Sequence, residues 1–412
     1  MNRSPLVSKF VQMAAVLALA VLCGLPKIVY AADGHWVTTW GCGPQLTESG
    51  NVPPTPLAEN TLRQFVRTSI AGKILRVRLS NAYGTDSVTI DTAHLALAAG
   101  TGSAGTGQID RATDATLKFR GAPSVVIPPG AVVYSDAVAF NLPAVSDVAI
   151  SIHFGQLSST TINGHPGSRT TSFIISGNTV SDADMAGATT TEHWYIITGI
   201  EVLADASSRA VVTFGDSITD GRGSDTNGNN RWPDDLAKRL VANAPTANIA
   251  VANMGIGGGG VFGGLGPSGQ NRFQRDVLTQ NGVRAVIIFI GVNDIGGAAS
   301  GTGATMAQNL ITAFTSFASQ AHARNILVYG ATITPFGTNS YYTADHESAR
   351  QTVNQWIRTT TAYDGCLDFD AVVRDPSSTI NLLPAYSSDG LHMTPAGYQA
   401  VASSINLNLF TQ

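Results

Sequence analysis

The segment VVTFGDSITDG, residues 211–221, decides the fold of the second half of the chain. Its first four residues are apolar or β-branched, which predicts a short buried strand. A glycine follows at once, so the chain is expected to turn tightly at Gly215 and to deliver Ser217 to the carboxyl end of that strand. A serine hydroxyl at a strand end is the first indication of a functional site.

Strand-like and helix-like segments alternate through this half of the chain. We expect strands at residues 210–214, 285–290 and 326–329, helices at residues 306–321, 346–361 and 395–407, and a further helix opening at Pro233. Such alternation is typical of a parallel sheet with helices on both faces. Ligands bind such sheets at the carboxyl ends of the strands, so the site should lie there.

The first half of the chain has a different pattern. Residues 74–80 and 149–154 alternate apolar and polar side chains, and residues 125–127 run into a Pro-Pro-Gly turn. Several short strands separated by turns predict an all-β sandwich or jelly roll. We therefore expect a β-sandwich domain over residues 33–206 and an α/β domain over residues 207–412.

Composition narrows the classes of partner. The chain has 412 residues, enough for two domains. Charged residues make up only 13% and the net charge is −4, so no basic stripe is available to bind a phosphate backbone, and nucleic acid is excluded as a partner. Many Gly, Ser, Thr and Asn residues are typical of an exported protein that acts on uncharged polymers or small molecules.

The first residues have the pattern of an export signal. Arg3 and Lys9 supply a positive start, residues 10–25 are uncharged and mostly apolar, and cleavage is expected after Ala31 or Ala32. A membrane anchor is the alternative, but the apolar run is shorter than the ~20 residues that span a bilayer. We expect a signal peptide at residues 1–32 and a secreted or periplasmic protein without stable membrane insertion.

Two cysteines remain after this cleavage, Cys42 and Cys366. An oxidising compartment would allow them to form a bridge between the domains. Spacing alone does not show that their Cβ atoms meet, so two free, buried thiols are an equal alternative.

Two further polar segments follow the pattern set by Ser217. Asn293 and Asp294 stand directly after the strand at residues 285–290, and Asp389 and His392 stand just before the last helix. Serine hydrolysis needs a nucleophile, a base, a carboxylate that orients the base, and donors for the oxyanion. A separation of three residues lets the carboxylate of Asp389 reach one imidazole nitrogen while the other faces a nucleophile.

From about residue 210 to the C-terminus, the chain resembles the SGNH hydrolases, also called the GDSL esterase and lipase family. Its blocks occur in order: Gly-Asp-Ser at 215–217, Asn-x-Gly-x-x-Gly around Gly258, Gly-x-Asn-Asp at 291–294 and Asp-x-x-His at 389–392. The resemblance implies a flavodoxin-like three-layer αβα fold. No cofactor or metal is expected, and the remaining histidines show no metal spacing. The resemblance also implies catalytic roles for Ser217, His392 and Asp389, and an oxyanion hole built from the N–H groups of Ser217 and Gly258 and the side-chain amide of Asn293.

Other interpretations of these residues are weaker. Gly255, Gly257 and Gly260 spell a dinucleotide fingerprint, but the loop continues instead of opening a helix. Residues 225–236 begin like a calcium loop yet lack its sixth-position Gly and its final Glu. Ser217 could simply cap the following helix, and Asn293, Asp389 and His392 could be structural residues of turns and caps.

The predicted function is a secreted serine esterase that removes short acyl groups, most simply acetyl, from carbohydrate. A lipid acylhydrolase or broad esterase is the rival within the same chemistry. A third hypothesis makes the N-terminal domain a glycan-binding module in which Trp36, Trp40 and Trp194 stack on sugars, although tryptophans of a sandwich are more often core residues. Because the base must be neutral, activity should fall as pH drops through ~6.5, with Asp389 favouring the charged imidazole.

Overall fold

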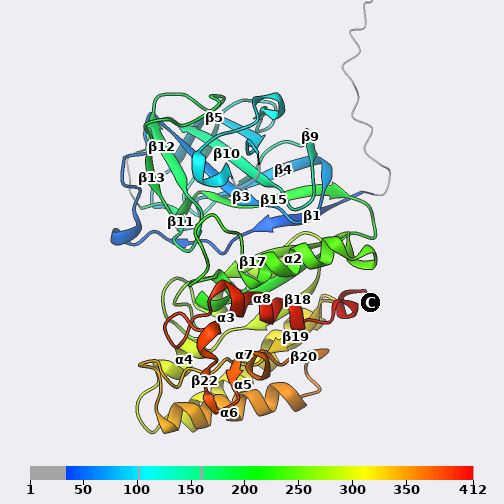
Figure 1. Ribbon diagram of the computed structural model, residues 1–412. Helices are drawn as coiled ribbons and strands as arrows, with labels where there is room; N and C mark the ends of the chain where they lie inside the picture. The colour runs from blue at the N-terminus through cyan, green and yellow to red at the C-terminus, as the bar shows by residue number, and fades with distance from the viewer. Residues whose placement is uncertain (1–33, 101–102, 158–160, 412) are drawn as a thin grey trace, which may run out of the picture.

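A computed structural model describes residues 34–100, 103–157 and 161–411. Figure 1 shows an N-terminal β region, residues 34–204, stacked on an α/β domain, residues 209–411. The predicted signal peptide, residues 1–32, lies outside the described residues.

The N-terminal β region is built from antiparallel sheets, which confirms the predicted β-sandwich. The first sheet has the order β1 (His35–Gly41), β15 (Ile197–Ala204), β4 (Gly72–Ser80) and β8 (Val132–Tyr134), with β9 (Val138–Leu142) also on β4. The second has the order β13 (Thr189–Thr191), β12 (Ser172–Ser176), β3 (Asn60–Arg67), β10 (Asp147–Phe154), β5 (Val88–Leu97) and β6 (Ala115–Leu117), with β7 (Val125–Ile127) also on β5. A small third sheet joins β14 (Trp194–Tyr195), β11 (Asn163–His165) and β2 (Gln45–Leu46).

Alternating side chains of the two larger sheets form the core between them. Val77 and Leu79 of β4 and Ile150 and Ile152 of β10 are fully buried in the same apolar cluster. Because side chains two residues apart point to the same face of a strand, each sheet turns one apolar face inward. The alternation seen in the sequence is therefore the sandwich interior.

The α/β domain contains a parallel sheet with helices on both faces (Figure 1), as predicted. Its strand order is β17 (Ile249–Gly255), β16 (Arg209–Gly215), β18 (Val283–Phe289), β19 (Leu327–Ala331) and β20 (Gly365–Leu367). The helices are α1 (Ser217–Asp220), α2 (Trp232–Ala242), α3 (Gly269–Phe273), α4 (Val292–Gly296), α5 (Gly303–His322), α6 (Ala344–Thr359), α7 (Phe369–Val373) and α8 (Pro395–Ser404), and β21 (Arg374–Asp375) pairs with β22 (Ser378–Leu382). The chain leaves β16 for β17 on one side and then for β18 on the other, so the order reverses beside β16, where such sheets bind ligands.

The sequence pattern missed some elements and boundaries. Strands β17 and β20 were not among the expected strands. Helix α8 ends at Ser404, earlier than the expected residue 407, because Ile405 has an extended backbone and a separate 3₁₀ turn follows at Leu407–Phe410.

The β region packs against the edge of the parallel sheet formed by β17. Strand β1 runs next to β17 (Figure 1), and Ala210 of β16 and Ala250 of β17 belong to the apolar core of the β region. Alanine side chains allow the two backbones to approach closely. The β region thereby covers a strand edge that would otherwise present unpaired backbone groups.

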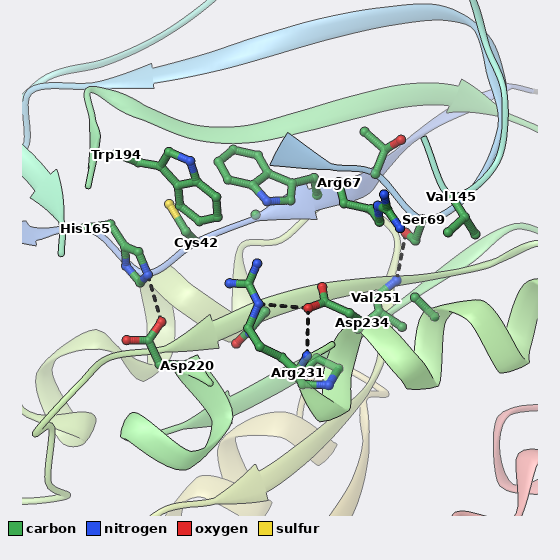
Figure 2. Close-up of a pocket in the computed structure, with 16 residues that line it drawn as sticks. Cys42, Arg67, Ser69, Val145, His165, Trp194, Asp220, Arg231, Asp234 and Val251 are labelled. Atoms are coloured by element: carbon green, nitrogen blue, oxygen red, sulfur yellow. Dashed lines mark hydrogen bonds and ion pairs between the residues drawn. The ribbon is translucent and has the colours of Figure 1, made fainter. Parts of the chain in front are cut away.

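Polar contacts cross the same boundary. Ser69 accepts a hydrogen bond from the Val251 N–H of β17 at 3.0 Å, a contact drawn in Figure 2, and its own hydroxyl donates to the Thr39 carbonyl at 2.7 Å. The Thr38 N–H donates to the Asn281 carbonyl at 3.0 Å. The enclosed space left between the two parts is a cavity of about 30 Å³, enough for a water molecule.

The cysteines do not form the bridge that the sequence allowed, and both thiols are free. Cys42 is buried beside β1, where burial raises the pKa of its thiol, and its sulfur lies 3.5 Å from the Ile197 carbonyl. Cys366 is exposed on β20, at the opposite edge of the parallel sheet from β17. The alternative of two free thiols is therefore correct, but only one of them is buried.

None of the helices in the described ranges has the length and apolar character needed to cross a bilayer.

We expect Ser69→Ala to lower the free energy of unfolding by about 1–3 kcal/mol, because it leaves the buried Val251 N–H without an acceptor. Urea unfolding measures this change. Ser124→Ala, at an exposed serine of the same region, is the matched control. Equal midpoints for the two variants would show that the Ser69 bridge does not join the two parts energetically.

Candidate active site

The turn after β16 places Ser217 at the carboxyl edge of the sheet. Asp216 caps α1 by accepting the Ile218 N–H at 3.0 Å, so Ser217 is the first helical residue and not the cap. A Cβ at Gly215 would lie 2.6 Å from the Phe289 carbonyl oxygen of β18, so only glycine fits this turn. Burial raises the pKa of the Asp216 carboxyl to about 7, partly offset by the bond from Ile218.

Ser217, His392 and Asp389 form a continuous chain of hydrogen bonds. The Ser217 Oγ lies 2.8 Å from His392 Nε2, and His392 Nδ1 lies 2.7 Å from Asp389 Oδ2. The other oxygen of Asp389 accepts the backbone N–H groups of His392 at 2.8 Å and Leu391 at 3.1 Å. The carboxylate is thus held from two sides, and a neutral imidazole that donates from Nδ1 leaves Nε2 free to accept the serine proton.

The electrostatics of His392 differ from the sequence-based expectation. Burial lowers the pKa of the imidazole, and this effect outweighs the bond and charge of Asp389, which raise it. The positive charges of Arg222 and Arg169 lower it further. Asp389 therefore favours the charged imidazole as expected, but desolvation of the ring reverses the net direction of the shift.

The Asp389 carboxylate is expected to stay ionised. Burial by itself would raise its pKa, but the bonds from the His392 backbone and ring and from the Leu391 N–H hold that pKa below the usual range. A charged Asp389 keeps the orientation of the ring fixed.

Gly258 and Asn293 lie in the same cleft as Ser217 and His392. Within residues 34–100, 103–157 and 161–411, neither the Ser217 N–H nor the Gly258 N–H has a protein acceptor. The Asn293 amide is oriented at both ends, since its Nδ2 donates to the Gly259 carbonyl at 2.8 Å and its Oδ1 accepts the Tyr341 hydroxyl at 3.0 Å. Its second N–H remains for a ligand, so three residues that line the cleft each offer a donor without a protein acceptor.

The glycine-rich loop is held by Asp294, a residue of the Gly-x-Asn-Asp block for which the sequence predicted no role. Its carboxylate accepts the Val261 N–H at 2.8 Å and the Phe262 N–H at 3.0 Å. Burial raises the pKa of Asp294, and these two bonds oppose that shift. The Gly-x-Asn-Asp block thus supplies one residue that faces the cleft and one that holds its wall.

The structure explains the loop glycines without a nucleotide. Gly258 has a φ of +68°, and a Cβ at Gly264 would lie 2.3 Å from the Gly258 carbonyl oxygen. The loop ends at Ser268, which caps the short helix α3, so the glycine motif does not open a helix. Close packing of the loop on itself requires these glycines, in addition to access for a substrate.

The β region forms one wall of the cleft, whose volume is about 370 Å³. The lining residues from the α/β domain include Ser217, Arg222, Gly258, Asn293 and His392, and those from the β region are Gln45, Glu48, Asn51, Pro166, Gly167, Arg169 and His193. The sequence predicted Ser217, Gly258, Asn293 and His392 by motif, but it did not predict Arg222. The sequence contains no signal for the lining residues from the β region, because these reach the cleft only when β1 packs beside β17.

A buried pair joins the β region to helix α1, which begins at Ser217. His165 Nε2 lies 2.9 Å from Asp220 Oδ1, and Figure 2 shows this contact crossing between the two parts. His165 Nδ1 lies 2.9 Å from the Gly43 carbonyl. The ring is therefore held at both nitrogens, by the chain after β1 and by α1.

The remaining sequence candidates lie outside the cleft. In the loop that begins like a calcium site, the Asn230 side-chain amide donates to Asp225 Oδ2 at 2.9 Å, and the Asp225 N–H donates to Asn230 Oδ1 at 3.0 Å. Among the described residues, no group of three or more His, Cys, Asp or Glu side chains is placed to hold a metal ion.

Trp40 and Trp194 are buried, 6% and 2% exposed, and pack edge to face, so they cannot stack on a sugar. Arg76 lies over the half-buried Trp36 ring.

Residues 213–400 match the model of the GDSL-like Lipase/Acylhydrolase family. A search of curated proteins found no match. Similar solved structures include a lipase/acylhydrolase from Enterococcus faecalis, with 23% identity, 49% of this chain and 95% of that chain covered, and a TM-score of 0.37. A GDSL-like lipase from Bacteroides thetaiotaomicron has 20% identity, 49% and 88% coverage and a TM-score of 0.35. An acetylxylan esterase from Geobacillus stearothermophilus has 19% identity, 48% and 92% coverage and a TM-score of 0.37.

We expect the His392 imidazole to titrate below the usual histidine value of 6.5, because its pKa is lowered by burial. Asp389→Asn should lower the midpoint further, since it removes the charge that favours the imidazolium. Arg222→Gln should raise it. NMR of labelled histidine, assigned with His392→Gln, measures all three midpoints. A wild-type midpoint above 6.5 would contradict the dominance of desolvation.

Proposed function

Because residues 213–400 belong to the GDSL-like lipase/acylhydrolase family, whose members are carboxylic ester hydrolases, we propose that this chain hydrolyses esters through an acyl-enzyme on Ser217. The observation that carries the proposal is the hydrogen-bonded chain from Ser217 through His392 to Asp389, next to donors without acceptors. This arrangement supplies every group that acyl transfer by a serine requires.

The geometry supports a two-step reaction. The Ser217 oxygen attacks the ester carbonyl while His392 Nε2 takes its proton, and Asp389 stabilises the resulting imidazolium. The N–H groups of Ser217 and Gly258 and the Asn293 amide bind the oxyanion of the tetrahedral intermediate. His392 then protonates the leaving alcohol, and water, activated by the same base, releases the acid from Ser217.

We propose a short acyl group on a carbohydrate as the substrate. The β-region wall of the cleft carries amide and imidazole side chains from Gln45, Asn51 and His193, which are suited to sugar hydroxyls. An export signal at residues 1–32, if cleaved, would place the enzyme outside the cytoplasm, where polysaccharides are met. N-terminal sequencing of the mature protein tests that location.

A lipid acylhydrolase remains the second candidate, and one observation favours it. Phe262 and Leu265 on the glycine-rich loop are 40% and 61% exposed, and Leu265 lines the cleft. Exposed apolar side chains at a cleft mouth suit an acyl chain or a lipid surface.

Replacing the proposed catalytic groups should separate their contributions. Ser217→Ala should abolish burst acylation, and Asn293→Ala should lower kcat by about 10²–10³-fold, the usual effect of losing one oxyanion donor. Stopped-flow assays with an aryl acetate measure both. Asn408→Ala, at an exposed asparagine far along the chain, is the control for Asn293. Wild-type kcat in Asn293→Ala would remove this amide from the mechanism.

A chain-length series identifies the acyl group. We expect kcat/KM to be highest for acetyl among aryl esters of increasing acyl length, and we expect acetate release from acetylated xylan. Higher kcat/KM for long-chain esters, reduced by Leu265→Ser, would support the lipid alternative.

A further inference from the structure

Two arginines of the cleft have no anionic partner. What they bind would specify the substrate of the proposed ester hydrolysis, and the inference rests on that proposed function. Arg169 comes from the β region and Arg222 from the α/β domain, and both line the cleft with Ser217 and His392. In the part of the chain that the structure describes, neither guanidinium forms an ion pair or a hydrogen bond. By contrast, the arginines that do have carboxylate partners are Arg67, Arg76, Arg231, Arg272, Arg275, Arg350, Arg358 and Arg374.

Arg169 is held by its backbone and not by its side chain. It has a φ of +50°, unusual for a residue with a side chain, and its carbonyl accepts the Asn227 N–H at 2.9 Å. Its Nε is buried and lacks a partner. A buried donor without an acceptor costs stability, so a ligand that supplies the acceptor has a physical advantage here.

Arg222 is placed by the nucleophile turn. Its N–H donates to the Ser217 carbonyl at 2.9 Å, and its own carbonyl accepts the Tyr398 hydroxyl at 2.6 Å. The side chain is exposed to the cleft. Arg222 is thus tied by its backbone to the residue that would attack the ester.

The carboxylates near these arginines are already bonded to other groups. Glu48 accepts from Gln45 Nε2 at 2.7 Å and from Asn51 Nδ2 at 3.0 Å. Asp220 faces His165 at 2.9 Å, and Asp389 faces His392 at 2.7 Å. The charge of the two guanidinium groups is therefore not neutralised within the cleft, and it reaches His392, whose pKa both arginines lower.

We propose that Arg169 and Arg222 form a subsite for a carboxylate of the substrate, so that the acylated carbohydrate is an acidic one that carries uronate residues next to the ester. Guanidinium groups bind carboxylates through paired, charge-assisted hydrogen bonds, which fix orientation as well as adding affinity. The amide and imidazole side chains of the same wall bind the hydroxyls of the sugar ring. One arginine comes from each part of the chain, so the subsite exists only when the β region is docked.

The test compares two substrates that differ only in charge. One is an acetylated oligouronide, and the other is the same oligomer with its carboxyl groups converted to primary amides. Acetate release is measured at about pH 8, where the base is neutral in every variant. The wild-type kcat/KM should be at least about 10-fold higher for the acid than for the amide, and salt should reduce the difference because it screens charge.

Variants assign the preference to the two side chains. Arg169→Gln and Arg222→Gln should each lower the ratio of the two kcat/KM values roughly 10-fold, mainly through KM for the acid. Arg111→Gln removes one charge from an exposed position outside the cleft and should leave the ratio unchanged. A ratio near 1 in wild-type enzyme, or equal losses on both substrates in the arginine variants, would overturn the subsite.

Failure of the subsite is distinguishable from failure of the proposed function. If acetate is released from the amidated oligomer and from acetylated xylan as fast as from the acidic oligomer, the carbohydrate esterase is retained and the subsite is rejected. If no acetate is released from any sugar while an aryl acetate is hydrolysed, both the carbohydrate substrate and the subsite are rejected, but the esterase is retained. Faster cleavage of a lysophospholipid, lost in Arg169→Gln, rejects a sugar carboxylate as the bound anion.

Discussion

Burial of β16 and β17 beneath the β region is the packing interaction on which the rest of the structure depends. Ala210 and Ala250 lie in the core of the β region, while the same strands end at the turn that carries Ser217 and at the glycine-rich loop. The β region therefore packs on the same two strands that lead into the site whose wall it forms.

The cleft combines two kinds of support. Motif residues of the α/β domain provide the proposed reacting groups, and polar contacts hold them, as Tyr341 holds Asn293 and Asp294 holds the loop. The β region adds the His165 contact to Asp220, one helical turn beyond Ser217. A site of this kind is preorganised, because its donors are oriented before any ligand arrives.

The order of blocks along the sequence was sufficient to predict the parallel sheet and to bring together Ser217, Gly258, Asn293, Asp389 and His392. Strand ends in a parallel sheet share one edge, so Ser217, Gly258 and Asn293 converge there, whereas Asp389 and His392 stand before α8 and were joined to them only by the family motif. The alternation of apolar and polar residues was likewise sufficient to predict the sandwich, since side chains two residues apart share a face of a strand. Local rules of this type operate over a few residues, and a single sequence displays them.

Other features were decided by tertiary structure alone. The direction of the pKa shift at His392 depends on how much of the ring is buried. Cys42 and Cys366 are free because Cys42 lies beside β1, next to β17, and Cys366 lies on β20 at the opposite edge of the parallel sheet. Arg169 reaches the cleft because the β region docks on β17. The sequence by itself determined the type of most elements and the polar residues that follow β16 and β18, whereas burial and contacts between distant surfaces arise from packing, which no short window of residues encodes.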